Sequence, residues 1–127
     1  MAFLDAKLKS GIEVVIEAVN LEEALKDADL VITGEGKIDY QTIYGKVPIG
    51  VAKIAKKYDI PVMAIGAIIG KDAEIVHKYG IDFLVKVSDP PMSLTETKQN
   101  KFYLIRNCIN QFLKKHMDDI LHLGITK

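Results

Sequence analysis

Three short apolar runs constrain the fold of this chain more than any other feature. They are Leu30–Ile32, Val62–Ile65 and Phe83–Val85. Short continuous apolar runs are typical of strands buried on both faces, and we expect the first to end in a tight glycine-containing loop and the second at Gly66. Helical patterns separate them over residues 48–58 and 72–79. This alternation predicts parallel strands joined by right-handed crossovers, in a small three-layer Rossmann-like α/β fold of about three strands.

Helical patterns are also found toward both ends of the chain. Ser10 and Asn20 each precede a glutamate by three residues, which is typical of helix N-caps, so we expect two short helices there with buried apolar faces. Asp72 is the expected N-cap of the helix over residues 72–79. A long amphipathic C-terminal helix is predicted over roughly residues 94–123, where apolar or aromatic side chains recur at steps of three and four. These residues are Phe102, Ile105, Ile109, Phe112, His116 and Ile120.

Composition narrows the class of protein. A chain of 127 residues, 49% hydrophobic and 27% charged, is typical of a globular domain, so we expect residues 1–127 to form a single α/β domain. The 17 basic and 17 acidic side chains cancel, which argues against nucleic acid or a membrane surface as partner. The longest apolar stretch, residues 62–70, is too short to span a bilayer. The one cysteine and the absence of a signal-peptide pattern favour a cytoplasmic location.

The segment after the first apolar run is the candidate functional site, because ligands of open parallel sheets bind outside the carboxyl ends of the strands. Glycines allow the backbone to approach an anion, carboxylates hold a divalent metal or accept a proton, and lysines neutralise phosphate. Phosphoryl transfer requires these groups. The residues that provide them are Gly34, Glu35, Gly36, Lys37, Asp39 and Lys46.

The spacing of these residues leaves alternatives open. A P-loop requires Ser or Thr directly after its lysine, and Lys46 is followed by a valine. The segment is therefore either an anion or metal site or a polar turn between a strand and a helix. Glu35 and Asp39 are metal ligands, a base and its orienting partner, or acids that favour a helix start. Lys37 and Lys46 bind phosphate or are simply exposed.

The same segment resembles a known family. Residues 29–39, 41–42 and 45–52 read DLVITGEGKID, QT and GKVPIGVA, which is similar to the glycerate kinase family, whose members phosphorylate D-glycerate with ATP and a divalent metal. The resemblance extends from Ser10–Glu13 to Pro91–Leu94. It implies that the chain corresponds to the carboxyl-terminal part of the nucleotide-fold domain of that family.

The resemblance also implies roles for single residues. Glu35 and Asp39 are implied to contact Mg²⁺ or the glycerate hydroxyl, and Asp39 is the better candidate for orienting or deprotonating that hydroxyl. Lys37 is implied to balance charge on the transferred phosphoryl group. The residues implied to contact substrate or phosphate are Gly34, Gly36, Gln41, Thr42 and Lys46.

Family members have a large additional amino-terminal portion, so the resemblance leaves three hypotheses. The chain acts in an ATP-dependent glycerate kinase together with the missing amino-terminal portion or a separate polypeptide that supplies it. Alternatively, it is a non-catalytic phosphate- or metal-binding module, or an inactive truncated remnant. In each case a three-stranded sheet leaves an unpaired strand edge, so we expect self-association.

Overall fold

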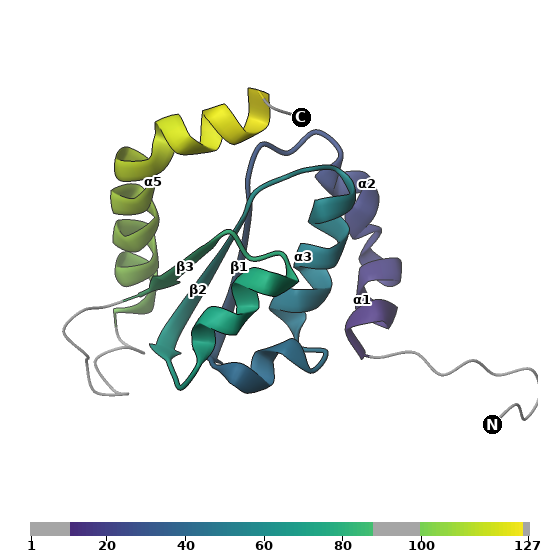
Figure 1. Ribbon diagram of the computed structural model, residues 1–127, viewed down its shortest axis with the longest axis horizontal. Coiled ribbons are helices and arrows are strands. Elements are labelled where there is room, and N and C mark those ends of the chain that lie inside the picture. Colours follow the sequence, from purple (N-terminus) through teal and green to yellow (C-terminus); the bar gives the residue numbers. More distant parts are fainter. Residues whose placement is uncertain (1–10, 88–99, 126–127) are drawn as a thin grey trace, which may run out of the picture.

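The computed structural model describes residues 11–87 and 100–125 of the chain, and Figure 1 shows the described elements as layers around a central sheet. The long helix α5 covers one side of the sheet, α3 lies on the other side, and α1 and α2 lie beyond α3. The elements in order are α1 (Gly11–Val19), α2 (Leu21–Leu25), β1 (Val31–Ile38), the 3₁₀ helix η1 (Tyr40–Ile43), α3 (Val47–Lys57), β2 (Val62–Ile69), the 3₁₀ helix η2 (Ala73–Tyr79), β3 (Phe83–Lys86) and α5 (Lys101–Ile125).

The sheet has the order β1-β2-β3, and both pairs of neighbouring strands are parallel. Val31 pairs with Val62, and Met63 pairs with Phe83. The central strand β2 is buried along most of its length, as expected for a parallel strand covered on both faces. The predicted three-layer α/β architecture is confirmed.

Two apolar clusters hold the layers together. On the α3 side, Val31 and Val62 pack with Ala52 and Ala55 of α3, all of them buried. On the α5 side, Met63 of β2 belongs to a second cluster. The members from α5 are Cys108, Phe112 and Ile120. The two sides of the sheet are therefore stabilised by separate sets of buried apolar contacts.

Strands β1 and β2 continue beyond the points where the sequence analysis ended them. The predicted tight loop after Ile32 is extended strand up to Ile38, and the prediction that the second strand ends at Gly66 is also wrong. The reason is the pairing itself, because Glu35 pairs with Gly66 and the two glycine-containing segments satisfy each other's backbone groups. Gly66 also leaves the space that Ile38 and Ile69 occupy, since a Cβ there would lie 3.3 Å and 2.9 Å from their Cδ1 atoms.

The alternation of faces along β1 is interrupted once. Val31 and Ile38 are seven positions apart, yet both belong to the cluster on the α3 side, whereas strict alternation would put them on opposite faces. The pairing between β1 and β2 has no partners at Gly36 and Ala67, which locates the irregularity. Asp39 consequently follows a residue that is anchored in the core.

The predicted helices form, but three details differ. Asn20 and Asp72 occupy the predicted N-cap positions, but both adopt left-handed backbone conformations and neither side chain forms the expected cap hydrogen bond. The predicted burial of the α1 apolar face is wrong for Val15 and Val19, which are 54% and 62% exposed. Segment 72–79 forms a 3₁₀ helix that ends, as predicted, at Gly80. The predicted cap at Ser10 lies outside the described residues.

Helix α5 packs against the sheet through only part of its apolar face. Phe112 is 8% exposed and its ring meets that of Phe83 edge-on at 4.9 Å, whereas Phe102 is 76% exposed. The described helix begins at Lys101, and the predicted start over residues 94–99 lies outside the described residues. The first turns of α5 therefore leave apolar side chains exposed beside the sheet.

Candidate functional site

The glycine-rich part of the candidate site is strand. Gly34, Glu35, Gly36 and Lys37 all belong to β1, and the positive backbone φ angles that characterise tight glycine turns occur, among glycines of the described segments, at Gly45 and Gly80. The predicted tight loop at Gly34 and Gly36 is therefore wrong, because both residues lie in extended strand. The backbone of these residues lies instead along the outer edge of the sheet.

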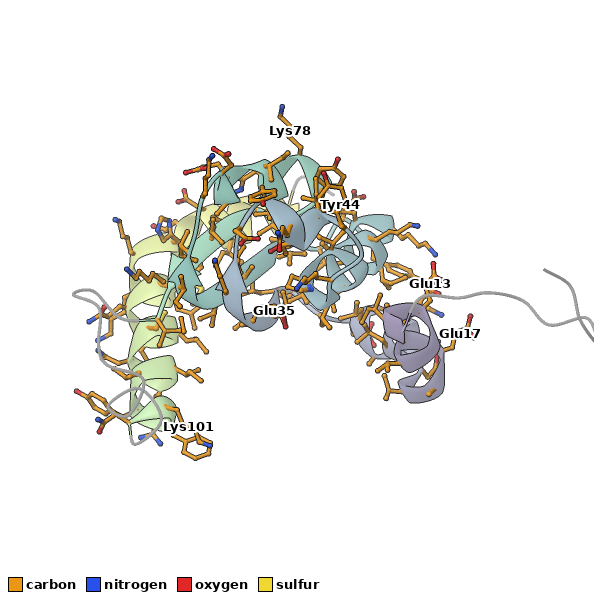
Figure 2. The ribbon with its side chains drawn as sticks, turned by 90° about the horizontal axis from the view of Figure 1, so that it is seen from below. Glu13, Glu17, Glu35, Tyr44, Lys78 and Lys101 are labelled. Atoms are coloured by element: carbon orange, nitrogen blue, oxygen red, sulfur yellow. The ribbon has the colours of Figure 1, made fainter. Side chains whose placement is uncertain are left out.

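Glu35 lines a pocket between this edge and α5. Figure 2 shows its side chain projecting outward from β1, on the side opposite Lys78. The pocket has a volume of about 490 Å³ and is also lined by Gly34, Gly36 and Lys101. Volumes of this size are typical of small-molecule sites. The pocket thus combines one carboxylate, one ammonium group and two glycines with apolar walls from β2 and α5.

Asp39 lies at the carboxyl end of β1 and caps the 3₁₀ helix that follows. Its Oδ1 accepts the backbone N–H of Gln41 at 2.9 Å, and its own backbone N–H donates to Thr42 Oγ1 at 3.0 Å. This reciprocal arrangement is a capping box. Only 12% of the Asp39 side chain is exposed. The carboxylate is thus held in one orientation.

Lys37 forms an ion pair with Asp39. Its Nζ lies 3.5 Å from Asp39 Oδ2, and 59% of the Lys37 side chain remains exposed. The pair stands beside the end of β2, where the Gly70 N–H donates to Ile38 O at 2.7 Å and the Tyr40 N–H donates to the carbonyl oxygen of Lys71 at 3.0 Å. An ammonium group and a carboxylate therefore meet at the carboxyl edge of the sheet, where parallel α/β folds bind ligands.

The remaining candidate residues lie further along the same connection. Gln41 is exposed and its Nε2 donates to Tyr40 Oη at 3.2 Å. Thr42 is 1% exposed, so its hydroxyl acts within the capping box and does not face a ligand. Lys46 is exposed directly before α3, and its N–H donates to Thr42 O at 3.4 Å. The structure thus links Lys37, Asp39 and Lys46 through one short connection.

Glu35 and Asp39 are not brought together. Glu35 lines the pocket beside α5, whereas Asp39 is not among the residues of that pocket and instead caps η1 and pairs with Lys37. Among the described residues there is also no group of three or more His, Cys, Asp or Glu side chains that could hold a metal ion. A metal ion held by protein groups alone therefore does not fit this site, whereas one held by a single carboxylate and a phosphate-bearing ligand does.

Two further residues lie near the site. Lys101 lines the Glu35 pocket, and no pattern in the sequence pointed to it. Gly70 lies against Lys37 and Asp39, whereas the sequence left open whether the glycines of residues 66–70 line the same cleft or allow close helix packing. Their positions depend on where α5 begins and how far β2 extends, and short-range patterns do not determine either.

Comparison with known proteins shows the family. The model of the glycerate kinase family matches residues 1–117, and the chain belongs to this family. It is 54% identical over 99 residues to a glycerate kinase of Halalkalibacterium halodurans, and 59% identical over 87 residues to a glycerate 2-kinase of Escherichia coli K12. These alignments cover 78% and 68% of this chain, but only 26% and 23% of the relatives. The chain thus spans about a quarter of the length of the curated relatives.

Comparison with a solved structure also supports the glycerate kinase family. The chain resembles the crystal structure of glycerate kinase 2 from Salmonella typhimurium LT2 with a TM-score of 0.56 and 40% sequence identity. The alignment covers 87% of this chain and 29% of that structure. In residues 11–87 and 100–125, no helix has both the length and the apolar character needed to cross a membrane.

Proposed function

We propose that this chain takes part in the transfer of the γ-phosphoryl group of ATP to a hydroxyl of D-glycerate, as one portion of a glycerate kinase. Such an enzyme is a phosphotransferase with an alcohol acceptor. The observation that carries the proposal is the position of the Lys37–Asp39 ion pair. It lies within the region that matches the glycerate kinase family, at the carboxyl end of a parallel strand.

Asp39 and Lys37 have complementary roles in this proposal. The hydroxyl oxygen of glycerate bonds to the γ-phosphorus while the bond from that phosphorus to the β–γ bridging oxygen breaks, and the hydroxyl proton passes to Asp39. The capping box orients the carboxylate for this contact, because the Gln41 N–H occupies Oδ1 and directs Oδ2 toward Lys37. Lys37 and Lys46 balance the negative charge on the phosphoryl oxygens, which requires placement more than covalent chemistry.

Glu35 and the neighbouring glycines form the second part of the proposed site. Mg²⁺ usually binds through one or two carboxylates together with substrate phosphates and water, and Glu35 lines a pocket large enough for such a ligand. Bound Mg²⁺ would neutralise charge on the phosphates. Gly34 and Gly36 leave the edge of β1 open to close approach by a phosphate group. We therefore assign Mg·ATP to the Glu35 side and glycerate to the Asp39 side.

The chain spans about a quarter of its curated relatives, so we propose that the amino-terminal portion of the family fold completes the site. This portion would cover the outer edge of β1 and the exposed apolar side chains beside the pocket, among them Ile32 and Ile105. Without it, the same edge favours self-association of this chain. A cytoplasmic location, where ATP is available, fits the proposed activity.

One observation favours a second candidate function. Both carboxylate oxygens of Asp39 already have a partner, Gln41 N for Oδ1 and Lys37 Nζ for Oδ2. A carboxylate with these two partners can act as a helix cap just as well as it can act as a general base. The alternative is therefore a phosphate- or metal-binding module that performs no phosphoryl transfer, or an inactive remnant of the family fold.

The test is the production of ADP from ATP, Mg²⁺ and D-glycerate. The chain is assayed alone and after mixing with a separately expressed amino-terminal portion of the Halalkalibacterium relative. The proposal predicts glycerate-dependent ADP formation on mixing, which Asp39→Asn abolishes. The matched control is Asp59→Asn, because Asp59 is exposed, lies outside the site and has a left-handed φ of 53° that asparagine tolerates. Phosphate binding without turnover would instead support the binding module.

A further inference from the structure

Gly70 is packed against the two residues of the proposed site that carry opposite charges. It follows β2 directly, and a Cβ atom at this position would lie 3.0 Å from Lys37 Cε and 3.1 Å from Asp39 Cβ. Its backbone is not in the left-handed region, since the positive-φ glycines of the described residues are Gly45 and Gly80. Glycine at this position therefore leaves room for the Lys37 and Asp39 side chains, and its backbone conformation is one that other residues also adopt.

The backbone at Gly70 has no room to withdraw from these side chains. The Gly70 N–H donates to Ile38 O at 2.7 Å, and the next carbonyl, that of Lys71, accepts the Tyr40 N–H at 3.0 Å. These two bonds fasten the end of β2 to the residues on either side of Asp39. A larger residue at position 70 must therefore displace side chains and not the backbone.

The two neighbours of Gly70 differ in their freedom to move. Asp39 is buried, its backbone N–H is bound to Thr42 Oγ1, and its carboxylate is bound to Gln41 N. The Cε of Lys37 is near the end of a long, largely exposed side chain. An added methyl group at Gly70 would therefore move Lys37 first.

We propose that Gly70 is a positioning residue for the proposed phosphoryl-transfer site, and that its missing side chain lets the Lys37 ammonium lie beside the Asp39 carboxylate. The catalytic role of Gly70 rests on the function proposed above. The contacts of Gly70 with Lys37 and Asp39 do not depend on that function. Gly70→Ala leaves both charged residues in the chain and displaces the Lys37 side chain from its present position beside Asp39. A longer and weaker ion pair, with both partners still present, is the specific consequence.

The structural test uses NMR spectroscopy on the 127-residue chain. In the unmodified protein, Gly70 Hα should show nuclear Overhauser effects to Lys37 Hε and to Asp39 Hβ; their absence from a folded protein would refute the geometry even if no variant folds. In Gly70→Ala, the Lys37 Nζ resonance should shift toward that of a free lysine. The control is Gly11→Ala, because a Cβ at Gly11 meets no atom within 4 Å. An unchanged Lys37 resonance in folded Gly70→Ala would overturn the proposal.

The functional test uses the mixed enzyme of the preceding subsection. Because Lys37 balances charge on the transferred phosphoryl group, loss of its positioned ammonium group should lower kcat about fivefold with a smaller change in the KM for ATP. Lys37→Ala should lower kcat by a similar factor, and Gly70→Ala should add nothing further in the Lys37→Ala background. Additive effects of the two substitutions would contradict a role through Lys37. Inactivity of the unmodified mixture would refute the proposed function, while the NMR result would still decide the role of Gly70.

Discussion

A hydrogen bond connects Asp39 and Thr42 at the end of β1, where the backbone N–H of Asp39 donates to Thr42 Oγ1 at 3.0 Å. The Asp39 side chain in turn caps the 3₁₀ helix that contains Thr42. Both residues are buried. The orientation of the proposed catalytic carboxylate therefore depends on a hydroxyl group that is inaccessible to any substrate.

The first prediction concerns this hydroxyl. Thr42→Val keeps the shape of the side chain but leaves the buried Asp39 N–H without its acceptor, which should lower the free energy of unfolding by about 1–3 kcal/mol. Urea denaturation measures the change. Thr42→Ser, which keeps the hydroxyl, is the matched control and should retain most of the stability. Equal stabilities of the valine and serine variants would show that the hydrogen bond contributes nothing.

A second prediction concerns the contact between α1 and α3. A Cβ at Gly50 would lie 2.5 Å from Ile12 Cγ1, so Gly50→Ala should separate the two helices and reduce stability by about 1–3 kcal/mol. In an Ile12→Ala background the same substitution should stabilise the protein, because alanine is the better helix former by about 1 kcal/mol. Thermal unfolding of the four proteins provides the comparison. Destabilisation that persists without the Ile12 side chain would be evidence against this contact.

A third prediction ranks two partners of one carboxylate. Asp82 Oδ2 accepts the backbone N–H of Val62 at 2.8 Å and also pairs with Lys56 Nζ. Asp82→Ala should cost about 1–3 kcal/mol, because it leaves the strand N–H without its acceptor. Lys56→Ala should cost less than about 1 kcal/mol, because this ion pair is partly exposed. Chemical denaturation would contradict the ranking if the lysine variant were the less stable of the two.

A fourth prediction follows from the buried thiol of Cys108. Burial raises the pKa of this thiol above its usual value of 9.0, and the thiol donates to Lys86 O at 3.6 Å. Because the unfolded chain releases this proton at lower pH than the folded protein, stability should fall as the pH rises through the unfolded pKa. Cys108→Ala should lose this part of the pH dependence. Parallel stability curves of both proteins between about pH 7.5 and 10 would contradict the assignment.

The sequence predicted the layers of the fold better than its connections. Apolar runs indicated where the three strands begin, and the residues that end α3 and η2 were located correctly within one position. The lengths of β1 and β2 were not predictable from local patterns, because Gly34, Gly36 and Gly66 weaken an isolated strand. Only the pairing of the two glycine-containing segments with each other makes them extended.

The candidate site, like the fold, was predicted from the sequence only in part. Residue chemistry identified Lys37 and Asp39, and the structure brings these two together. The sequence left open that Asp39 favours a helix start, and the structure shows it as the N-cap of η1. That this helix is a 3₁₀ helix and that Thr42 is buried were not predictable, because both depend on the path of the chain after Ile38. The contact of Gly70 with this pair depends on the register of β2, which arises only in the folded sheet.

The most direct test of the proposed function is a chimera. The segment of the Escherichia coli relative that matches this chain is replaced by the matching residues of this chain, and glycerate-dependent ADP formation is measured. If this chain supplies a functional part of a glycerate kinase site, the chimera is active and Asp39→Asn inactivates it. A folded chimera without activity, alongside an active parent enzyme, would contradict the proposal that this chain takes part in phosphoryl transfer.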